Sequence, residues 1–206
     1  FVWGNIEKIR QKYNKAVIYY NKALILSPRD APILGALGEV EKRRGNYKLA
    51  DELLRKALKG SSTKSQIKNK VICNTVLADI LRRWAESLIK DREYKDALKK
   101  LEEAFNFAKE ACNLDNEDKQ TKKILLDVLK DYAIQLLYRK NLDEALPFFK
   151  EAITEKPNRV KEKKVNVVCC FHLMKKYLDI GQNEEAKKYF ELGKKSCFFG
   201  DKYLKK

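Results

Sequence analysis

Apolar side chains recur every three to four residues in two stretches of residues 31–58, and a glycine separates the stretches. The segment reads APILGALGEVEKRRGNYKLADELLRKAL, with Gly45-Asn46 at the break. A period of three to four residues places the apolar side chains on one face of an α-helix. A Gly-Asn pair between such stretches is typical of a turn. The pattern therefore predicts two amphipathic helices joined tightly.

The same skeleton recurs along the rest of the chain, which predicts five helix pairs in one array. The other copies carry, in chain order, Trp3-Gly4, Tyr13, Ala16, Tyr20, Ala23 and Pro28; Trp84-Ala85, Tyr94, Ala97, Leu101 and Ala104; Tyr132-Ala133, Leu142, Ala145, Phe149, Ala152 and Pro157; and, more weakly, Leu173-Met174, Gly181, Asn183, Ala186, Phe190 and Gly193. The predicted repeats cover about 1–30, 31–60, 64–113, 117–157 and 158–197.

These residues resemble the tetratricopeptide repeat (TPR) consensus. In the clearest copy the matching positions are Leu34, Leu37-Gly38, Tyr47, Ala50, Leu54 and Ala57. The resemblance covers nearly the whole chain. It implies an all-α fold, a right-handed superhelical solenoid of about five TPR-like helix pairs with about ten helices and no β-sheet.

Packing explains why a large and then a small residue stand together in each first helix. A small residue is needed where two helices approach most closely, and a large apolar side chain fills the neighbouring hollow. The pairs are Trp3-Gly4, Leu37-Gly38, Trp84-Ala85, Tyr132-Ala133 and Leu173-Met174. Because Met174 breaks the small-residue rule, we expect the last pair to pack less tightly. The consensus aromatic residues are expected in the core: Tyr13, Tyr20, Tyr47, Tyr94, Phe149 and Phe190.

The spacing of the equivalent alanines indicates lengthened helices. Ala16, Ala50, Ala97, Ala145 and Ala186 are separated by 34, 47, 48 and 41 residues, whereas the TPR period is about 34. Long apolar patterns run from about Gln66 to Ile89 and from Tyr94 to Cys112. Thr63 or Ser65 is a candidate N-cap for the first, and residues 113–116 are predicted to form the loop after the second.

Composition supports a helical, water-exposed protein. Hydrophobic residues make 44% and charged residues 36%, with 8 Gly and 4 Pro, and no apolar run reaches the roughly 18 residues that a membrane span needs. Five cysteines form no C-x-x-C pair, so we expect reduced core thiols and a cytoplasmic location. The chain starts at Phe1 without Met, so we expect it to be part of a longer polypeptide.

The net charge of +16 is concentrated at the two ends. Residues 1–60 and 158–206 each carry 13 Lys and Arg against 6 Asp and Glu, whereas 117–157 carry 8 against 8. Lys outnumbers Arg 35 to 10, and Lys is often solubilising surface. The alternative is an acidic protein or a nucleic-acid partner.

Catalytic and metal-binding chemistry has little support. The single histidine, His172, follows Cys169-Cys170-Phe171, but adjacent helical cysteines point about 100° apart and no second cysteine pair completes a tetrahedral site. Phosphate loops, nucleophile elbows and HExxH motifs are absent from the sequence. We therefore predict no enzyme activity, no cofactor and no metal site.

The TPR resemblance implies that first helices line a concave groove and supply the ligand contacts. By register, the groove residues are Asn5, Lys8, Glu39, Lys42, Arg43, Arg82, Arg83, Glu86, Lys130, Ile134, Tyr138, Phe171, His172 and Lys175. Tyr138 and Phe171 stand off the consensus core positions, which makes them candidates for ligand contact. Arg82 and Arg83 are candidates for holding carboxylates; the alternative is helical salt bridges from Arg82 to Glu86 and from Arg83 to Asp79.

One TPR subfamily binds the acidic C-terminus of heat-shock chaperones through two Lys, two Asn and an Arg. The equivalent positions here hold Phe1, Asn5, Ala36, Asp79 and Arg83, so that activity is not implied. The leading hypothesis is a non-catalytic interaction scaffold that binds an acidic protein or peptide in a basic groove. The alternatives are an RNA-binding superhelix and a regulatory array of a larger enzyme.

Overall fold

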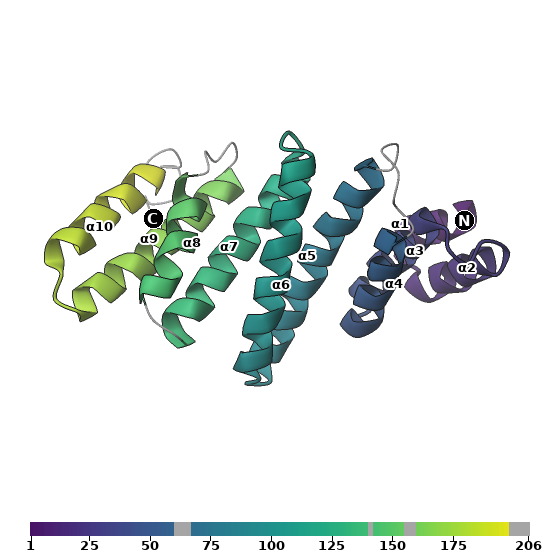
Figure 1. Ribbon diagram of the computed structural model, residues 1–206, viewed down its shortest axis with the longest axis horizontal. Coiled ribbons are helices and arrows are strands. Elements are labelled where there is room, and N and C mark those ends of the chain that lie inside the picture. Colours follow the sequence, from purple (N-terminus) through teal and green to yellow (C-terminus); the bar gives the residue numbers. More distant parts are fainter. Residues whose placement is uncertain (60–66, 140–141, 155–159, 198–206) are drawn as a thin grey trace. The chain divides into compact units, whose positions relative to one another are not determined.

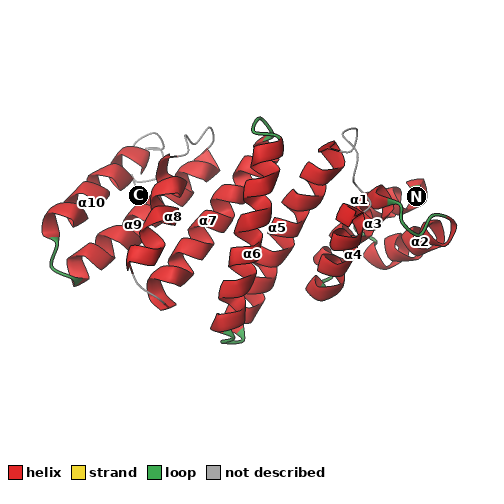
Figure 2. Cartoon of the chain, in the orientation of Figure 1, coloured by secondary structure: helices red, strands yellow, loops and turns green. Residues whose placement is uncertain are grey.

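The chain is helical throughout the part that the structure describes. The computed structural model describes residues 1–59, 67–139, 142–154 and 160–197, and these residues form ten α-helices and no strand (Figures 1 and 2). The helices are α1 (Val2–Ile9), α2 (Tyr13–Leu26), α3 (Ala31–Arg43), α4 (Tyr47–Lys59), α5 (Ile67–Lys90), α6 (Tyr94–Leu114), α7 (Lys119–Arg139), α8 (Leu142–Thr154), α9 (Val160–Asp179) and α10 (Asn183–Cys197). The all-α helical-repeat prediction is confirmed.

The helices form two compact units, Phe1–Ile124 and Leu125–Lys206. In the first unit α1 packs on α2, α2 on α3, α3 on α4, α4 on α5 and α5 on α6. In the second unit α9 packs on both α8 and α10. The single array over all five pairs stays a prediction, and each unit is described by itself.

One turn structure closes four of the helix pairs. In each, the second residue after the first helix has positive φ: Gln11 (59°), Gly45 (82°), Arg92 (65°) and Gly181 (76°). The next amide donates to a carbonyl five residues back, as Asn46 N does to Glu41 O at 2.9 Å. This is the geometry of a Schellman cap, in which a left-handed residue ends the helix. The predicted turn at Gly45 is therefore present, and the same turn occurs at Gly181.

The small residues of the first helices lie at close helix contacts, as the register predicts. A Cβ on Gly4 would lie 2.5 Å from Tyr20 Cε1, and one on Gly38 would lie 3.0 Å from Leu54 Cγ. Ala85 and Ala133 are fully buried. Because the neighbouring side chains fill the space completely, these contacts fix how each first helix sits on its second helix.

Three packing expectations are wrong. Trp3 is exposed, because α1 is the first helix of the unit and packs mainly on α2. Phe190 is exposed and its neighbour Tyr189 is buried instead, stacked on Tyr177 with ring centroids 5.5 Å apart. The last pair is also not loose, since a Cβ on Gly193 would lie 3.1 Å from Cys170 Cβ.

The lengthened helices are present. The two long patterns correspond to α5 and α6, with 24 and 21 residues. Helix α6 extends two residues past Cys112, so Asn113 and Leu114 are helical rather than part of the predicted loop. The candidate caps Thr63 and Ser65 lie outside the described residues.

Candidate functional site

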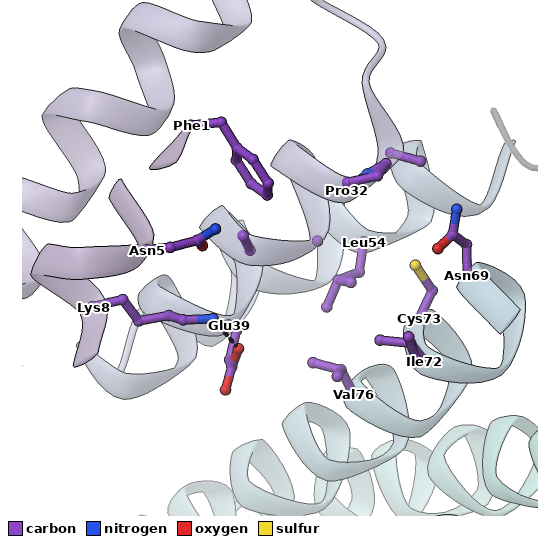
Figure 3. Close-up of a pocket in the computed structure, with 13 residues that line it drawn as sticks. Phe1, Asn5, Lys8, Pro32, Glu39, Leu54, Asn69, Ile72, Cys73 and Val76 are labelled. Carbon is purple, nitrogen blue, oxygen red and sulfur yellow. Dashed lines mark hydrogen bonds and ion pairs between the residues drawn. The ribbon is translucent and has the colours of Figure 1, made fainter. Parts of the chain in front are cut away.

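An open cleft of about 240 Å³ lies on the first helices of unit 1. Its lining comes from α1, α3 and α5, with Leu54 of α4 at the bottom (Figure 3). The lining residues are Phe1, Asn5, Lys8, Ala31, Pro32, Gly35, Ala36, Glu39, Leu54, Asn69, Ile72, Cys73 and Val76. Most of these side chains are apolar, so the cleft offers a surface for apolar partner groups.

The cleft exists because α3 presents small side chains to it. Helix α3 starts sharply, since the Asp30 side chain accepts a hydrogen bond from Ile33 N at 2.9 Å and Pro32 occupies the first turn. One helical turn later, Gly35 and Ala36 leave space between the neighbouring first helices. Ile72 of α5 stands at the opposite wall, where it is 59% exposed.

Two hydrogen-bonded pairs hold the polar side of the cleft. Tyr20 OH donates to Asn5 Oδ1 at 2.7 Å. Lys8 Nζ contacts Glu39 Oε2 at 3.0 Å (Figure 3). Burial, with a smaller contribution from Glu39, raises the pKa of Tyr20 to about 12, so its hydroxyl stays a proton donor. The predicted residues Asn5 and Lys8 therefore line the cleft, but each already has an intramolecular partner.

Further along α3 and α5, three cations surround one carboxylate. Lys42 Nζ lies 2.9 Å from Asp79 Oδ2, Arg83 Nε lies 3.1 Å from the same atom, and Arg82 lies 3.4 Å from Oδ1. Burial would raise the pKa of Asp79, yet Lys42, Arg83 and Arg82 together hold it below its ordinary value. The Lys42–Asp79 pair joins two neighbouring first helices.

The helical salt bridges considered from the sequence are both present. Arg82 Nη1 contacts Glu86 Oε1 at 2.7 Å, and Arg83 Nε contacts Asp79 Oδ2 at 3.1 Å. The two arginines therefore have a structural role, and removing them would also weaken the packing around Asp79. Arg43 is exposed and makes no hydrogen bond or ion pair among the described residues.

A second cleft, with a volume of about 290 Å³, adjoins the first on α5. Ile72 and Val76 line both clefts, so they form the ridge between them. The far wall comes from the start of α7 and the residues before it, including Asp118 and Gln120. Asp118 Oδ2 accepts hydrogen bonds from the amide and hydroxyl of Thr121, which orders this wall.

The remaining predicted groove residues lie in unit 2. Lys130 Nζ contacts Asp131 Oδ1 at 3.1 Å. Tyr138 of α7 and Phe171 of α9 are both exposed, and both lie against His172. Lys175 is exposed one turn after Phe171. The sequence placed these residues in one groove with those of unit 1, and that arrangement stays a prediction.

The apolar half of the cleft was missed from the sequence. The predicted groove residues of α3 and α5 lie in the C-terminal halves of both helices, because the register was anchored on Leu37 and Trp84. Residues 69, 72, 76, 79 and 83 recur at helical spacing, so extending that face backwards along α5 leads to Ile72. The same step along α3 leads to Pro32.

No reactive group lines the cleft among the residues described. Cys73 is buried, and burial raises the pKa of its thiol to about 11, which keeps the weakly nucleophilic thiol form. Over the described ranges, no three His, Cys, Asp or Glu side chains gather closely enough to hold a metal ion. None of the described helices is both long and apolar enough to cross a membrane.

Residues 10–153 match a family model, that of the fourth ARM domain of tetratricopeptide repeat protein 21. The chain belongs to this tetratricopeptide repeat family. The match spans α2 through most of α8, so it includes the α3 and α5 walls of the cleft. A search of curated proteins finds no match.

Solved structures share the fold of this tetratricopeptide repeat protein. MamA is 18% identical, with 97% of each chain covered and a TM-score of 0.59. BtubC from P. vanneervenii is 16% identical over 97% of this chain and 79% of its own, with a TM-score of 0.57. YrrB, described as a TPR protein with an unusual peptide-binding site, is 19% identical over 94% of this chain and 82% of its own, with a TM-score of 0.56. At these identities the likeness concerns the fold.

Proposed function

We propose that the chain is a non-catalytic protein-interaction module, which holds an extended peptide or a helix of a partner protein in the cleft on α1, α3 and α5. The observation that carries the proposal is the open apolar cleft itself, with Ile72 exposed at its wall. An exposed apolar side chain in a concave site is an anchor point for a partner side chain. The described peptide-binding site of YrrB agrees with this use of the fold.

The partner segment is proposed to be acidic as well as apolar. The C-terminal parts of α3 and α5, beyond the cleft, carry four cationic side chains (Lys42, Arg43, Arg82 and Arg83) and two anionic ones (Asp79 and Glu86) on the predicted groove face. The local excess of positive charge favours a partner carboxylate. Asp79 already pairs with Lys42, Arg82 and Arg83, so little positive charge is left for a ligand. This favours a protein segment with a few carboxylates over an RNA strand, which would bring a phosphate with every nucleotide. The cytoplasmic location stays a prediction.

Replacing Ile72 by glutamate is expected to weaken partner binding by about tenfold or more, because a carboxylate replaces an apolar anchor. Peptides selected from a displayed random library against the parent chain serve as ligands, and their affinities are measured by fluorescence anisotropy. Ile18→Glu is the matched control, since Ile18 is 54% exposed on α2 and outside the cleft. Equal losses in both variants would place the binding surface elsewhere.

Salt dependence separates the protein ligand from the nucleic-acid alternative. A peptide held by one or two ion pairs should lose less than about tenfold in affinity between 50 and 200 mM salt, whereas a ligand with 6 to 10 contacted phosphates loses roughly 10³ to 10⁵. If single-stranded RNA binds with the steep loss of affinity expected for many phosphate contacts, and the library yields no binding peptide, the RNA-binding function is favoured.

A further inference from the structure

Unit 2 carries an exposed aromatic cluster that lies outside the cleft of unit 1. Tyr138 of α7 and Phe171 of α9 are each 55% exposed. Their rings both meet the His172 ring edge-on, with centroids 5.7 Å and 5.8 Å away. Exposed aromatic groups that touch one another are typical of interface hot spots rather than of a solvated helix surface.

The cluster continues as an apolar stripe along α9. Val168, Phe171 and Leu178 are exposed and follow one another at spacings that keep them on one helix face. The stripe from residue 168 to residue 178 is about 15 Å long, close to three helical turns. Lys175 is exposed within it, one turn after Phe171 and one turn before Leu178.

Hydrogen bonding orders the aromatic cluster before any partner arrives. The Tyr138 hydroxyl lies 3.0 Å from His172 Nδ1. Burial, and then the nearby Lys175, lower the pKa of His172, so the imidazole is neutral at neutral pH. In the tautomer protonated at Nε2, Nδ1 accepts a hydrogen bond from the Tyr138 hydroxyl. A fixed ring pair loses little conformational entropy on binding.

We propose that the stripe formed by Tyr138, Phe171, Lys175 and Leu178 is a docking surface for an amphipathic α-helix of a partner protein, one that carries acidic side chains beside its apolar face. The inference goes beyond the proposed function, because it concerns a second surface in the other compact unit. A chain with two such surfaces would bind two partner segments, and partners that engage both would gain affinity from the linkage.

The charge of the partner helix follows from the position of Lys175. A helix that covers Phe171 and Leu178 also covers Lys175, and a covered ammonium group is costly unless a carboxylate pairs with it. Lys175 makes no hydrogen bond or ion pair within the described part of the chain, so it is available to a partner. Acidic side chains on the docking helix meet this requirement.

The conformation of the partner follows from α9 itself. The backbone groups of a helix are bonded internally, so the stripe offers no edge to which a strand could be added. Side chains at positions i, i+3, i+4 and i+7 of a second helix match a stripe of this spacing. A helix of about three turns is long enough to cover it.

The experiment uses a labelled synthetic peptide of about 18 residues, long enough to populate a helix, with leucines on one face and glutamates elsewhere. A second peptide has the same composition but no apolar face, and a third has lysine in place of glutamate. Anisotropy titrations of the parent chain are expected to give an affinity at least tenfold tighter for the first peptide than for the other two.

Two matched pairs of variants locate the binding. Phe171→Ser should weaken binding of the acidic peptide about tenfold, whereas Phe190→Ser, at a similarly exposed phenylalanine of α10, should leave the affinity unchanged. Lys175→Glu should weaken the acidic peptide and improve the lysine peptide, and Lys187→Glu on α10 should do neither. Because Lys175 is exposed, this charge exchange is measurable even where Phe171→Ser fails to fold.

The proposal is overturned if the peptide without an apolar face binds as tightly, if Phe190→Ser weakens binding as much as Phe171→Ser, or if Lys175→Glu does not change the preference between the two charged peptides. Because the acidic peptide also fits the occupant proposed for the cleft of unit 1, the four variants of unit 2 are tested in the Ile72→Glu background as well, where the same changes in affinity are expected. If Ile72→Glu loses the library-selected peptides while these changes remain, both proposals are supported, and either can fail without the other.

Discussion

Replacing Gly38 by leucine is expected to lower the free energy of unfolding of unit 1 by roughly 1 to 3 kcal/mol or more, because overpacking a dense helix contact forces the helices apart. Even a methyl group at this position would lie 3.0 Å from Leu54 Cγ and 3.3 Å from the Ala50 carbonyl oxygen. Urea unfolding followed by far-UV circular dichroism measures the change. Ala145→Leu tests a fully buried small residue of α8, a second helix, in unit 2.

Gly35→Ala is the control for Gly38→Leu, since it lies on the same helix. A Cβ on Gly35 would be 3.9 Å from Leu54 Cδ2, an ordinary contact, and alanine favours a helix over glycine by up to about 1 kcal/mol. A small gain in stability is therefore expected. Unchanged unfolding curves for Gly38→Leu would mean that α3 and α4 do not approach at this residue.

Replacing Asp79 by alanine is expected to destabilise unit 1 by on the order of 3 kcal/mol, because it leaves Lys42, Arg82 and Arg83 crowded together without their shared carboxylate. The side chains of Lys42, Asp79 and Arg82 are each only 11% exposed, so water screens them little. Asp96→Ala is the control: Asp96 is exposed and lies 3.7 Å from Lys99, and such a pair contributes about 1 kcal/mol at most. Similar losses in both variants would contradict a special role of Asp79.

The stability difference between the parent and Asp79→Ala should depend on pH. The folded pKa of Asp79 lies below its unfolded value, which is about 3.9 for aspartate. The stabilisation by the carboxylate is therefore fully present above that value and is lost as the pH falls through the lower folded pKa. Urea unfolding at neutral pH should show a large difference in the free energy of unfolding between the parent and Asp79→Ala. Below about pH 3 this difference should be smaller.

Local pattern was enough to predict most of the core of unit 1. Ala16, Tyr20, Leu54 and Ala57 are buried because a repeated large and small pairing leaves one face for packing. The helical salt bridges of Arg82 and Arg83 also follow from spacing alone. The Lys42–Asp79 pair does not, since it joins residues 37 positions apart and depends on how two helices are inclined.

The predicted positions of side chains were wrong where the repeat departs from the consensus spacing. In α10 the aromatic residue that reaches the core is Tyr189, because its stacking on Tyr177 replaces the contact expected of Phe190. In α5 the extra turns before Trp84 bring Ile72 into the cleft, and the consensus has no position for those turns. Exposure of Tyr138 and Phe171 could be predicted because both stand off the consensus, but their common contact with His172 depends on the fold.

The most direct test of a binding cleft on the first helices is a nuclear magnetic resonance titration of the chain with a library-selected peptide. The measured quantity is the chemical-shift change of each side-chain methyl group and backbone amide in unit 1. We predict the largest changes at the methyl groups of Ile72 and Val76 and at the amide of Gly35, with none at Ile18. Changes confined to second helices such as α2, with Ile72 unaffected, would contradict the proposed cleft.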